Sequence, residues 1–287
     1  MPPIDVVMPT FNRPRDILRA AVESAAASPL IHRIIVIDDG STTAASELLA
    51  DLDPRIEVLR QDNAGPSAAR NRGLETSTAP YLLLLDDDDE LVPASLEPMI
   101  ALAENFGASA ILGAREEFGA GLPIKPLPWP SDLTDRPWPD RRDVFRPLSA
   151  LRGGALIRRS PAIAPLRFDP SLKIYEDKEY LYQCAAHGPT VASSTLSVRV
   201  RRWPTGESLT SPHHLDRRVT DHIAIQTRYP ELRDFAGWRE QTRWLLRSYA
   251  KQGHNAGVWS RARKAASECA VKPGLKASVR GLARFNF

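Results

Sequence analysis

The chain has 287 residues, of which 43% are hydrophobic, a composition that supports a substantial core and is unlike that of a disordered protein. Two cysteines cannot form a framework of disulfides, so we expect a reducing compartment, the cytoplasm. No run approaches 18 consecutive apolar residues, and we expect neither a membrane-spanning helix nor a signal peptide.

The net charge of +3 conceals an asymmetry along the chain. From Arg243 to Phe287, ten Lys and Arg residues stand against one acidic residue, Glu268, whereas residues 1–242 carry 28 basic and 34 acidic residues. An acidic body and a basic tail therefore need separate explanations.

The first hundred residues alternate between strand and helix signals, which predicts a mostly parallel sheet with helices on both faces. We expect strands at Ile4–Met8, Ile34–Ile37, Ile56–Leu59 and Tyr81–Leu85. We expect helices through Ile17–Ala25 and Leu48–Leu49, over Pro66–Thr76, and from Pro93 onward.

Regular patterns end between about Ala114 and Pro147, where seven prolines and two tryptophans occur. Trp129 and Trp138 favour an ordered segment, either beside a sugar pocket or in ordinary packing. Beyond it we expect order from Gly153–Ile157, a helix over Glu176–His187, a strand over Thr195–Arg201 and helices after Pro212.

Four consecutive aspartates, Asp86–Asp89, follow the apolar run Tyr81–Leu85. Such an abrupt end is typical of a buried parallel strand at its carboxyl end, where open α/β sheets bind ligands. Adjacent carboxylates repel one another unless a cation lies among them, and Mg²⁺ or Mn²⁺ prefers oxygen ligands. Taken alone, the run also fits a solvated acidic turn.

Two other predicted strands end in polar residues, at Pro9–Arg13 and at Asp38-Asp39. If the strands are parallel neighbours, these segments meet Asp86–Asp89 along one edge of the sheet. An aromatic ring stacks on a base, carboxylates accept hydrogen bonds, and a divalent ion neutralises a diphosphate. The edge therefore suits a nucleoside diphosphate, although Asp39 alone also fits a cap for the following helix.

The loop Asn63–Gly73 precedes the fourth strand. Gly65 and Pro66 fix a tight turn there, and Arg70 and Asn71 are placed to reach a base or an acceptor. An arginine on a helix is more often a surface charge, so this signal is weak by itself.

Five segments, taken in order, resemble the inverting enzymes of glycosyltransferase family 2, which have the GT-A fold. They are Val7–Pro14, Val36–Thr42, Asn63–Leu74, Leu85–Asp89 and Glu176-Asp177. Leu85–Asp89 matches the D-x-D-D version of the family's D-x-D metal motif, and Glu176-Asp177 matches its E-D motif. A single D-x-D is common by chance, but this ordered set is specific.

The resemblance implies a role for each matching residue. Those implied to contact the nucleotide are Pro9, Thr10, Phe11, Asn12, Arg13, Asp39, Gly65, Arg70, Asp86 and Asp87. Phe11 would stack on the base, with uracil favoured and thymine or guanine as alternatives. Asp88 would bind Mn²⁺ or Mg²⁺, with Asp89 as a competitor because the four aspartates leave the register open.

The resemblance further implies that Asp177 is the catalytic base. The chemistry agrees, since inverting transfer needs one carboxylate to take the acceptor's proton, while a metal stabilises the diphosphate leaving group. The helix dipole at the start of the predicted helix would keep Asp177 ionised. Without the other motifs, Glu176 and Asp177 would be read as ordinary residues of a first helical turn.

Residues near Arg201, Arg202 and Trp203 correspond to a lid over the diphosphate in this family. Arg199 stands where processive members carry glutamine, which argues against a processive synthase. Glu176, Gly154 and this lid segment are our candidates for acceptor contacts. We therefore expect a GT-A catalytic domain over residues 1–212, nucleotide-binding in 1–113 and acceptor-binding in 114–212, with a helical basic extension over 213–287.

The basic tail mixes ten cations with apolar residues such as Trp244 and Trp259. This pattern fits a helix lying on an anionic membrane surface, on the inner face, and fits a solvated extension or an oligomer contact equally well. No recognised motif for nucleic acid accompanies the charge.

Other classes of protein fit less well. Ile37 occupies the nucleophile position of a haloacid dehalogenase-type phosphotransferase, and the first strand lacks the glycine-rich turns of dehydrogenases and nucleotidyltransferases. The alternative is a non-catalytic module that binds a nucleotide-sugar or glycan. We expect an inverting, metal-dependent transferase that moves a sugar from a UDP-sugar to a hydroxyl of a glycan, glycolipid or surface-polysaccharide precursor.

Overall fold

The computed structural model describes residues 1–119, 121, 123–129, 131–145, 154–203, 214–252 and 255–271. The chain forms two compact units. The sheet unit comprises residues 1–141, 148–170 and 180–202, and the helical unit comprises residues 142–147, 171–179 and 203–287. The boundary therefore falls inside helix α5 (Glu176–Cys184). The predicted divisions at residues 113 and 212 stay a prediction.

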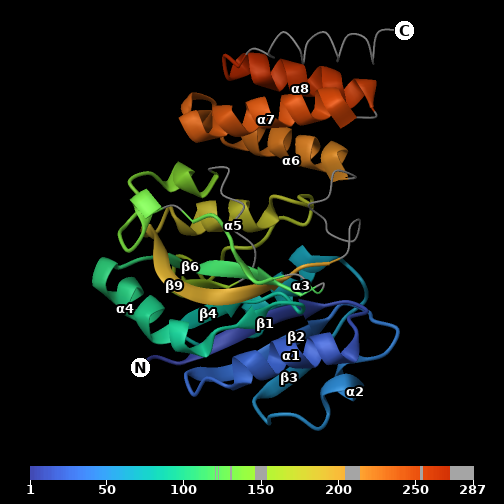
Figure 1. The fold of residues 1–287 in the computed structure, drawn as a ribbon, viewed down its shortest axis with the longest axis vertical. Helices are drawn as coiled ribbons and strands as arrows, with labels where there is room; N and C mark the ends of the chain where they lie inside the picture. Colours follow the sequence, from blue (N-terminus) through green and yellow to red (C-terminus); the bar gives the residue numbers. More distant parts are fainter. Residues whose placement is uncertain are drawn as a thin grey trace. The chain divides into compact units, whose positions relative to one another are not determined.

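One sheet of nine strands forms the centre of the sheet unit within the described residues (Figure 1). Its strand order is β3-β2-β1-β4-β8-β6-β9-β5, and β7 pairs with β6. The strands are β1 (Ile4–Thr10), β2 (Ile31–Asp38), β3 (Ile56–Arg60), β4 (Tyr81–Leu84), β5 (Glu90–Leu91), β6 (Ala110–Phe118), β7 (Lys125–Pro126), β8 (Ala155–Arg158) and β9 (Thr190–Arg201).

The four N-terminal strands are all parallel, as the sequence predicts. In the register, Thr10 lies opposite Asp38 and Val7 lies opposite Leu84, so β2, β1 and β4 end at the same edge of the sheet. On the other side of β4, β8 runs antiparallel between β4 and β6, while β6 and β9 are parallel. This is the mixed, mostly parallel sheet of a GT-A-type fold.

Helices cover the sheet because alternate residues of its strands are apolar on both faces. In β2, Ile34 and Val36 join the main core with α1 and α4, whereas Ile35 and Ile37 pack with Ala69 of α3. The helical segments of this unit are α1 (Arg15–Ala26), α2 (Ala45–Leu49), α3 (Pro66–Thr76), α4 (Leu96–Phe106), η1 (Pro93–Ser95) and η2 (Ser131–Leu133).

Helix α3 packs very closely on β1. A Cβ atom built on Gly73 would lie 2.3 Å from Cγ1 of Val7, so only glycine fits between the helix and the strand. This contact holds α3, and the loop that precedes it, against the strand ends.

The proline-rich segment differs from the sequence prediction. Strand β6 extends to Phe118, into the segment where no regular element was expected, because its pairing with β9 continues to Arg201. Trp138 is buried beside β9 and donates its backbone N–H to the Thr190 carbonyl at 2.9 Å, so it packs against the sheet. Pairing with strands that are distant in the sequence decides the structure here, although the proline content predicts an irregular segment.

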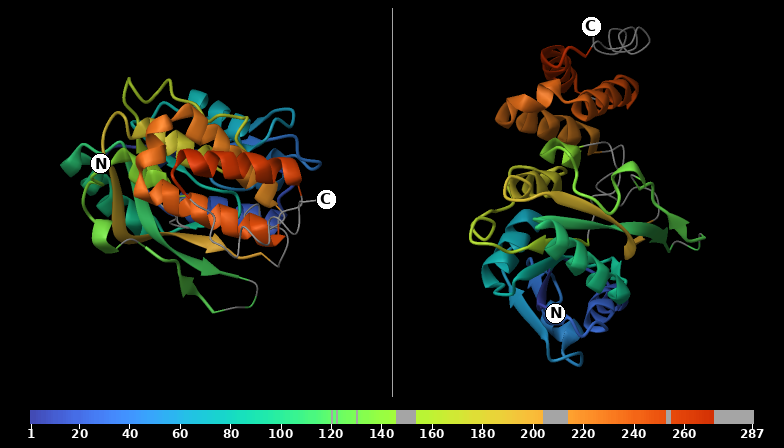
Figure 2. Two further views of the ribbon diagram at one scale, coloured as in Figure 1. Left: turned by 90° about the horizontal axis from the view of Figure 1, so that it is seen from above. Right: turned by 90° about the vertical axis from the view of Figure 1, so that its left-hand side faces the viewer.

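The helical unit contains α6 (Leu215–Arg228), α7 (Ala236–Gln252) and α8 (Ala256–Glu268), which lie side by side in both views of Figure 2. Its core includes Trp238, whose ring stacks on His222 with centroids 3.9 Å apart and meets Phe145 edge-on at 5.2 Å. Short 3-10 turns occur at η3 (Arg141–Phe145) and η5 (Pro230–Asp234). Among the described helices, none combines the length and apolar character needed to span a bilayer.

Candidate active site

The three predicted strand ends do meet at one edge of the sheet. The Thr10 hydroxyl at the end of β1 donates to Asp87 Oδ2 at 2.6 Å, just beyond β4. The Asp39 N–H, which follows β2, donates to the Thr10 carbonyl at 2.9 Å. The expected juxtaposition of Pro9–Arg13, Asp39 and Asp86–Asp89 is therefore confirmed.

The aspartate run alternates between buried and partly exposed side chains. Asp87 and Asp89 are 5% and 3% exposed, whereas the side chains of Asp86 and Asp88 are 32% and 20% exposed. A fully solvated acidic turn is thus the wrong description of this segment. Alternation sends two carboxylates into the protein and leaves two facing outward.

Arginines lie among these carboxylates and offset their mutual repulsion. One guanidinium nitrogen of Arg13 lies 2.7 Å from Asp87 Oδ1 and 3.5 Å from Asp88 Oδ2. Arg70 from α3 lies 2.8 Å from Asp86 Oδ1. Burial opposes the charge of Arg13, but its bond to Asp87 and the charges of the run raise its pKa.

Burial nevertheless raises the pKa of two of the carboxyl groups. For Asp87 the cost of burial exceeds the opposing effects of Arg13 and Thr10. For Asp89, burial and the charges of Asp86 and Asp88 raise the pKa well above its ordinary value. The site therefore holds negative charge at a cost in stability.

Asp39 organises the loop that leads into α3. Its Oδ1 accepts hydrogen bonds from Gln61 Nε2 at 2.8 Å and from the Ala64 N–H at 2.9 Å, and its Oδ2 accepts from the Gly65 N–H at 2.8 Å. A carboxylate has about four acceptor positions, so one remains for a ligand. At the start of α2 the Ala45 N–H donates a hydrogen bond to Asp38. Asp38, and not Asp39, therefore bonds the beginning of that helix.

The segment after β1 is held in a shape that exposes an aromatic ring. Asn12 has a φ of +50° and bonds the loop after β2 twice, through its N–H to Ser41 Oγ and through its Oδ1 from the Thr42 N–H. Asparagine tolerates this left-handed conformation better than most residues. Phe11, just before it, is 48% exposed at the end of the strand, while Pro9 pairs within the sheet opposite Ile37.

Gly65 precedes α3 with a φ of +89°, a conformation that favours glycine. On the same helix, Arg70 also lies over the Phe168 ring, 5.5 Å from its centroid. Asn71 pairs with the backbone of Phe168 through two hydrogen bonds, at 2.9 and 2.8 Å. In this structure Asn71 holds the segment around Phe168.

The strands β8 and β9 bring further candidates to the aspartate run. The Gly154 N–H donates to the Leu84 carbonyl at 2.6 Å, and a Cβ on Gly154 would lie 2.3 Å from Val198 Cγ2. Arg201 donates its N–H to Asp89 Oδ1 at 3.0 Å and its side-chain Nε to the Asp88 carbonyl at 3.2 Å. Arg202 instead pairs with Glu117 at 2.7 Å.

The remaining candidates, Glu176, Asp177 and Trp203, belong to the helical unit. Glu176 is 8% exposed, and Asp177 lies in the first turn of α5, where its Oδ1 accepts the Lys178 N–H at 2.6 Å. The roles that the family resemblance implies for Asp88 as metal ligand and Asp177 as base require both to act on one bound substrate, and this stays a prediction.

The donor set of the sheet edge fits a divalent cation of the kind that bridges phosphates. Among the described residues, no three His, Cys, Asp or Glu side chains form a cage for a metal ion. An ion at a nucleotide site needs only one or two carboxylates, because diphosphate oxygens and waters complete its shell. Asp88 and Asp86, the partly exposed members of the run, meet that requirement.

Two residues near the site were missed in the sequence. Gln61 bonds Asp39, and the charge of Arg115, only 2% exposed on β6, partly opposes the rise in the pKa of Asp89. Neither lies in a recognisable motif. Arg115 stands beside two glutamates in the sequence, so nothing there marks it as a buried residue.

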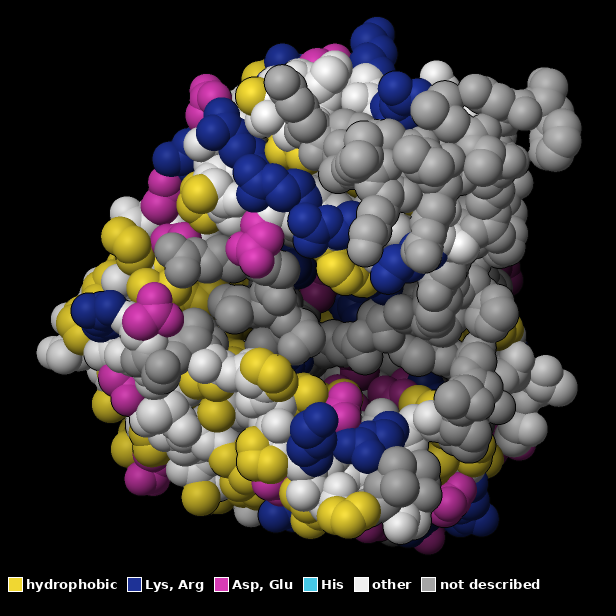
Figure 3. Space-filling model, turned by 45° about the horizontal axis from the view of Figure 1, so that its top comes forward, with side chains coloured by type: hydrophobic (Ala, Val, Ile, Leu, Met, Phe, Trp, Pro, Cys, Tyr) yellow, Lys and Arg dark blue, Asp and Glu magenta, His cyan; other side chains and the backbone are white. Residues whose placement is uncertain are grey.

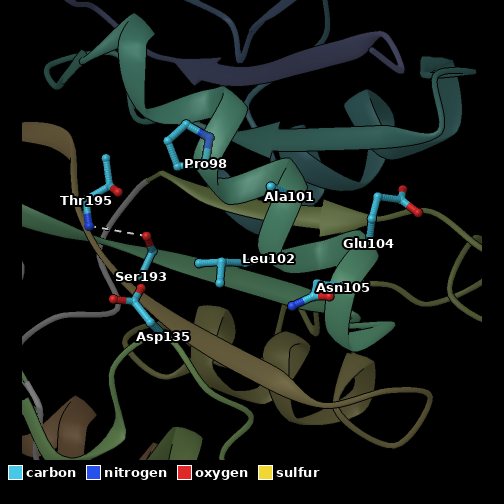
Figure 4. Close-up of a pocket in the computed structure, with 8 residues that line it drawn as sticks. All are labelled: Pro98, Ala101, Leu102, Glu104, Asn105, Asp135, Ser193 and Thr195. Atoms are coloured by element: carbon cyan, nitrogen blue, oxygen red, sulfur yellow. Dashed lines mark hydrogen bonds between the residues drawn. The ribbon is translucent and has the colours of Figure 1, made fainter.

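A separate groove lies between α4 and β9 (Figure 4). It is lined by Pro98, Ala101, Leu102, Glu104, Asn105, Asp135, Ser193 and Thr195. None of the predicted site residues lines it, and Figure 4 shows mostly small or uncharged side chains facing it. We therefore do not assign the chemistry to this groove.

Comparison with known proteins agrees with the fold and the motifs. The sequence profile described as "Glycosyl transferase family 2" matches residues 5–164, more than half of the chain. The chain therefore belongs to glycosyl transferase family 2 and is a glycosyltransferase.

The chain is similar to several bacterial relatives. It is 27% identical over 291 residues to the succinoglycan biosynthesis protein ExoW of Rhizobium meliloti, covering 92% of this chain and 89% of ExoW. It is 36% identical over 104 residues to the uncharacterized glycosyltransferase YibD of Escherichia coli, covering 35% of this chain and 30% of YibD.

The fold is similar to that of a solved structure. Residues 1–349 of Staphylococcus aureus TarS, crystallised in complex with UDP-GlcNAc, superpose with a TM-score of 0.62 at 14% identity. The similarity covers 99% of this chain and 92% of that structure. At this identity the likeness shows the fold.

We expect Asp89→Asn to raise the free energy of unfolding at neutral pH, because the amide does not carry the buried charge. Because the folded pKa of Asp89 is raised, the wild type is most stable below the unfolded pKa and loses stability as pH rises through the folded pKa. The advantage of the variant should therefore grow with pH. Urea unfolding between pH 4 and 8 measures it, with the exposed Asp62→Asn as control; a constant or negative difference would contradict the prediction.

Proposed function

We propose that this glycosyltransferase moves a sugar from a UDP-sugar to a hydroxyl group with inversion at the sugar carbon. The observation that supports this most is the joined edge of β1, β2 and β4, where Phe11, Asp39 and Asp86–Asp89 are brought together. The acceptor class would be a glycan, a glycolipid or a surface-polysaccharide precursor. The similarity to ExoW, a succinoglycan biosynthesis protein, favours polysaccharide assembly.

The nucleotide would bind along this edge in a defined order. The exposed ring of Phe11 offers a stacking surface for uracil, and the remaining acceptor position of Asp39 suits a ring N–H. Asp88, with Asp86 and Asp87 nearby, would hold Mn²⁺ or Mg²⁺, which would neutralise charge on the departing diphosphate. Arg13, Arg70 and Arg201 would share the remaining charge of the run.

The proton would be taken by Asp177. As the acceptor oxygen bonds to the sugar carbon, the bond from that carbon to the diphosphate oxygen breaks and the hydroxyl proton passes to the Asp177 carboxylate. Asp177 lies in the first turn of α5, where the helix dipole favours an anion. The products are the glycosylated acceptor and UDP.

A non-catalytic module that binds nucleotide-sugars is the alternative. Such a module would bind UDP-sugar without releasing UDP, whereas an enzyme releases UDP faster when its acceptor is present. A coupled assay of UDP release, with and without a glycan acceptor, separates the two.

We expect Asp177→Asn to reduce transfer by roughly 10³-fold or more, because the amide cannot accept the proton. UDP affinity should stay unchanged, since nucleotide contacts are proposed for the sheet unit. Assays of sugar transfer measure the first effect, and calorimetry of UDP binding measures the second. Turnover at the wild-type rate would remove Asp177 from the role of base.

We expect Asp88→Ala to abolish the gain in UDP affinity that Mn²⁺ provides, because the ion loses its protein carboxylate. Calorimetry of UDP binding with Mn²⁺ and with EDTA measures this gain, and the exposed Asp62→Ala should keep it. An Mn²⁺-dependent gain as large as that of the wild type would exclude Asp88 as the ligand. Loss of the gain in Asp89→Ala alone would shift the register by one residue.

We also propose that the helical unit touches an anionic membrane surface. Helix α7 exposes Arg243, Trp244, Arg247 and Lys251 along one face, and Arg218 of α6 lies 5.4 Å from the centre of the Trp244 ring. Dark-blue Lys and Arg side chains are prominent over the upper part of Figure 3, where the C-terminal helices are drawn. Such a stripe around an exposed Trp suits lipid headgroups. The tail residues after Val271 that the sequence singles out lie outside the described residues.

Replacing Arg243, Arg247 and Lys251 with Glu should weaken binding to phosphatidylglycerol vesicles by at least roughly a hundredfold, because each lost cation contributes about 1 kcal/mol and each Glu adds repulsion. Vesicle co-sedimentation measures this, with the exposed Arg15, Lys125 and Arg136 replaced by Glu as a charge-matched control. Equal losses of vesicle binding in both triple variants, or no loss in the first, would contradict the membrane contact and indicate that α7 is a solvated helix.

A further inference from the structure

A buried carboxylate of α6 bonds the segment that leads directly into α5. Asp221 Oδ2 accepts hydrogen bonds from the backbone N–H groups of Lys173 and Ile174, each at 2.7 Å, and of Tyr175 at 3.3 Å. These residues precede Glu176-Asp177 at the start of the helix. One side-chain oxygen therefore fixes three consecutive peptide groups just before the proposed base.

Asp221 is placed there at an energetic cost. It is only 3% exposed, and burial raises the pKa of its carboxyl although the three N–H groups lower it. Bonds from N–H groups to a carboxylate are about twice as strong as bonds between neutral groups. A buried acid with this cost is better explained by the segment that it orders than by packing alone, because an apolar residue would fill the space without the cost.

Other contacts within the helical unit hold the same turn from further positions. Gln241 of α7 donates to the Tyr175 hydroxyl at 2.5 Å. Glu179, one turn after Glu176, is 1% exposed and bonds Arg228 at 3.1 Å and the Tyr229 hydroxyl at 2.5 Å. The first turn of α5 is thus tied to α6, to α7 and to the residue that follows α6.

The residue next to the proposed base is also constrained. The Lys178 ammonium lies 5.7 Å from the centre of the Tyr175 ring, and burial lowers its pKa to about 8, against the opposing charge of Asp177. The nearby His222 stays neutral, because burial lowers its pKa to about 3. The contact with the Tyr175 ring links the position of Lys178 to this ordered segment.

We propose that Asp221 is a positioning residue for catalysis, which holds the Glu176-Asp177 turn in its working orientation through the backbone of residues 173–175. This inference rests on the proposed role of Asp177 as the base. It makes the C-terminal helices a working part of the enzyme, in addition to any contact that they make with a membrane.

The test compares Asp221→Ala with Asp221→Asn and with Asp216→Ala. Asp216, also on α6, bonds the Tyr249 hydroxyl within the same unit but has no contact with residues 173–175, so it is a matched control for lost stability. We expect Asp221→Ala to lower kcat by roughly a hundredfold, the scale of a misplaced catalytic group. The KM for the donor and the affinity for UDP should stay unchanged.

Asp221→Asn keeps one carbonyl oxygen as an acceptor and should give an intermediate kcat, whereas Asp216→Ala should keep the wild-type kcat even if its melting temperature falls equally. If Asp221→Ala does not fold, the other two variants decide the question: the positioning role requires a lower kcat for Asp221→Asn than for Asp216→Ala. A wild-type kcat for Asp221→Asn and Asp221→Ala, or equal kcat losses in Asp221→Ala and Asp216→Ala, would overturn the positioning role.

These outcomes are separable from a failure of the proposed function. If Asp177→Asn is inactive while the Asp221 variants turn over normally, only the positioning role is wrong. If Asp177→Asn turns over normally, the base is wrong, whatever the Asp221 variants do.

Discussion

The buried carboxylate of Asp87 joins the ends of two neighbouring strands, and the candidate site depends on this connection. One of its oxygens accepts a hydrogen bond from the Thr10 hydroxyl at the end of β1, and the other pairs with the Arg13 guanidinium in the segment that follows. The connection is possible only because β1 and β4 are parallel neighbours that end at the same edge. Asp86 and Asp88, on either side of Asp87, remain partly exposed, with side chains 32% and 20% exposed.

The aspartates at this edge of the sheet repel one another, and neighbouring arginines offset part of this repulsion. Burial raises the pKa of Asp87 and of Asp89, while Arg13, Arg70 and Arg201 supply opposing charge or hydrogen bonds. Buried carboxylates with raised pKa values are common at sites that bind charged ligands. A bound cation would neutralise negative charge that the arginines do not balance. In the helical unit, Asp221 shows the same pattern of a costly buried carboxylate beside a proposed catalytic group.

The sequence predicted the parts that depend on local pattern. Apolar runs that end abruptly in polar residues gave β1, β2 and β4 and their shared edge, and Pro66 marked the first residue of α3. Local pattern was silent where distant segments decide the structure: residues 115–118 continue β6 because β9 pairs with them, and the antiparallel direction of β8 follows from its pairing with β4 and β6. Asp221 could not be found either, because its partners lie about 46 residues away and a lone aspartate on a helix gives no signal.

The central claim is that the edge formed by β1, β2 and β4 binds a nucleoside diphosphate together with a divalent ion. A thermal-shift screen of UDP, dTDP, GDP and ADP, each with and without Mn²⁺, tests it without knowledge of the acceptor. The account predicts that UDP with Mn²⁺ raises the melting temperature most, and that Phe11→Ala, which removes the stacking ring, reduces this shift. If no nucleoside diphosphate raised the melting temperature in the presence of Mn²⁺, the account would be contradicted.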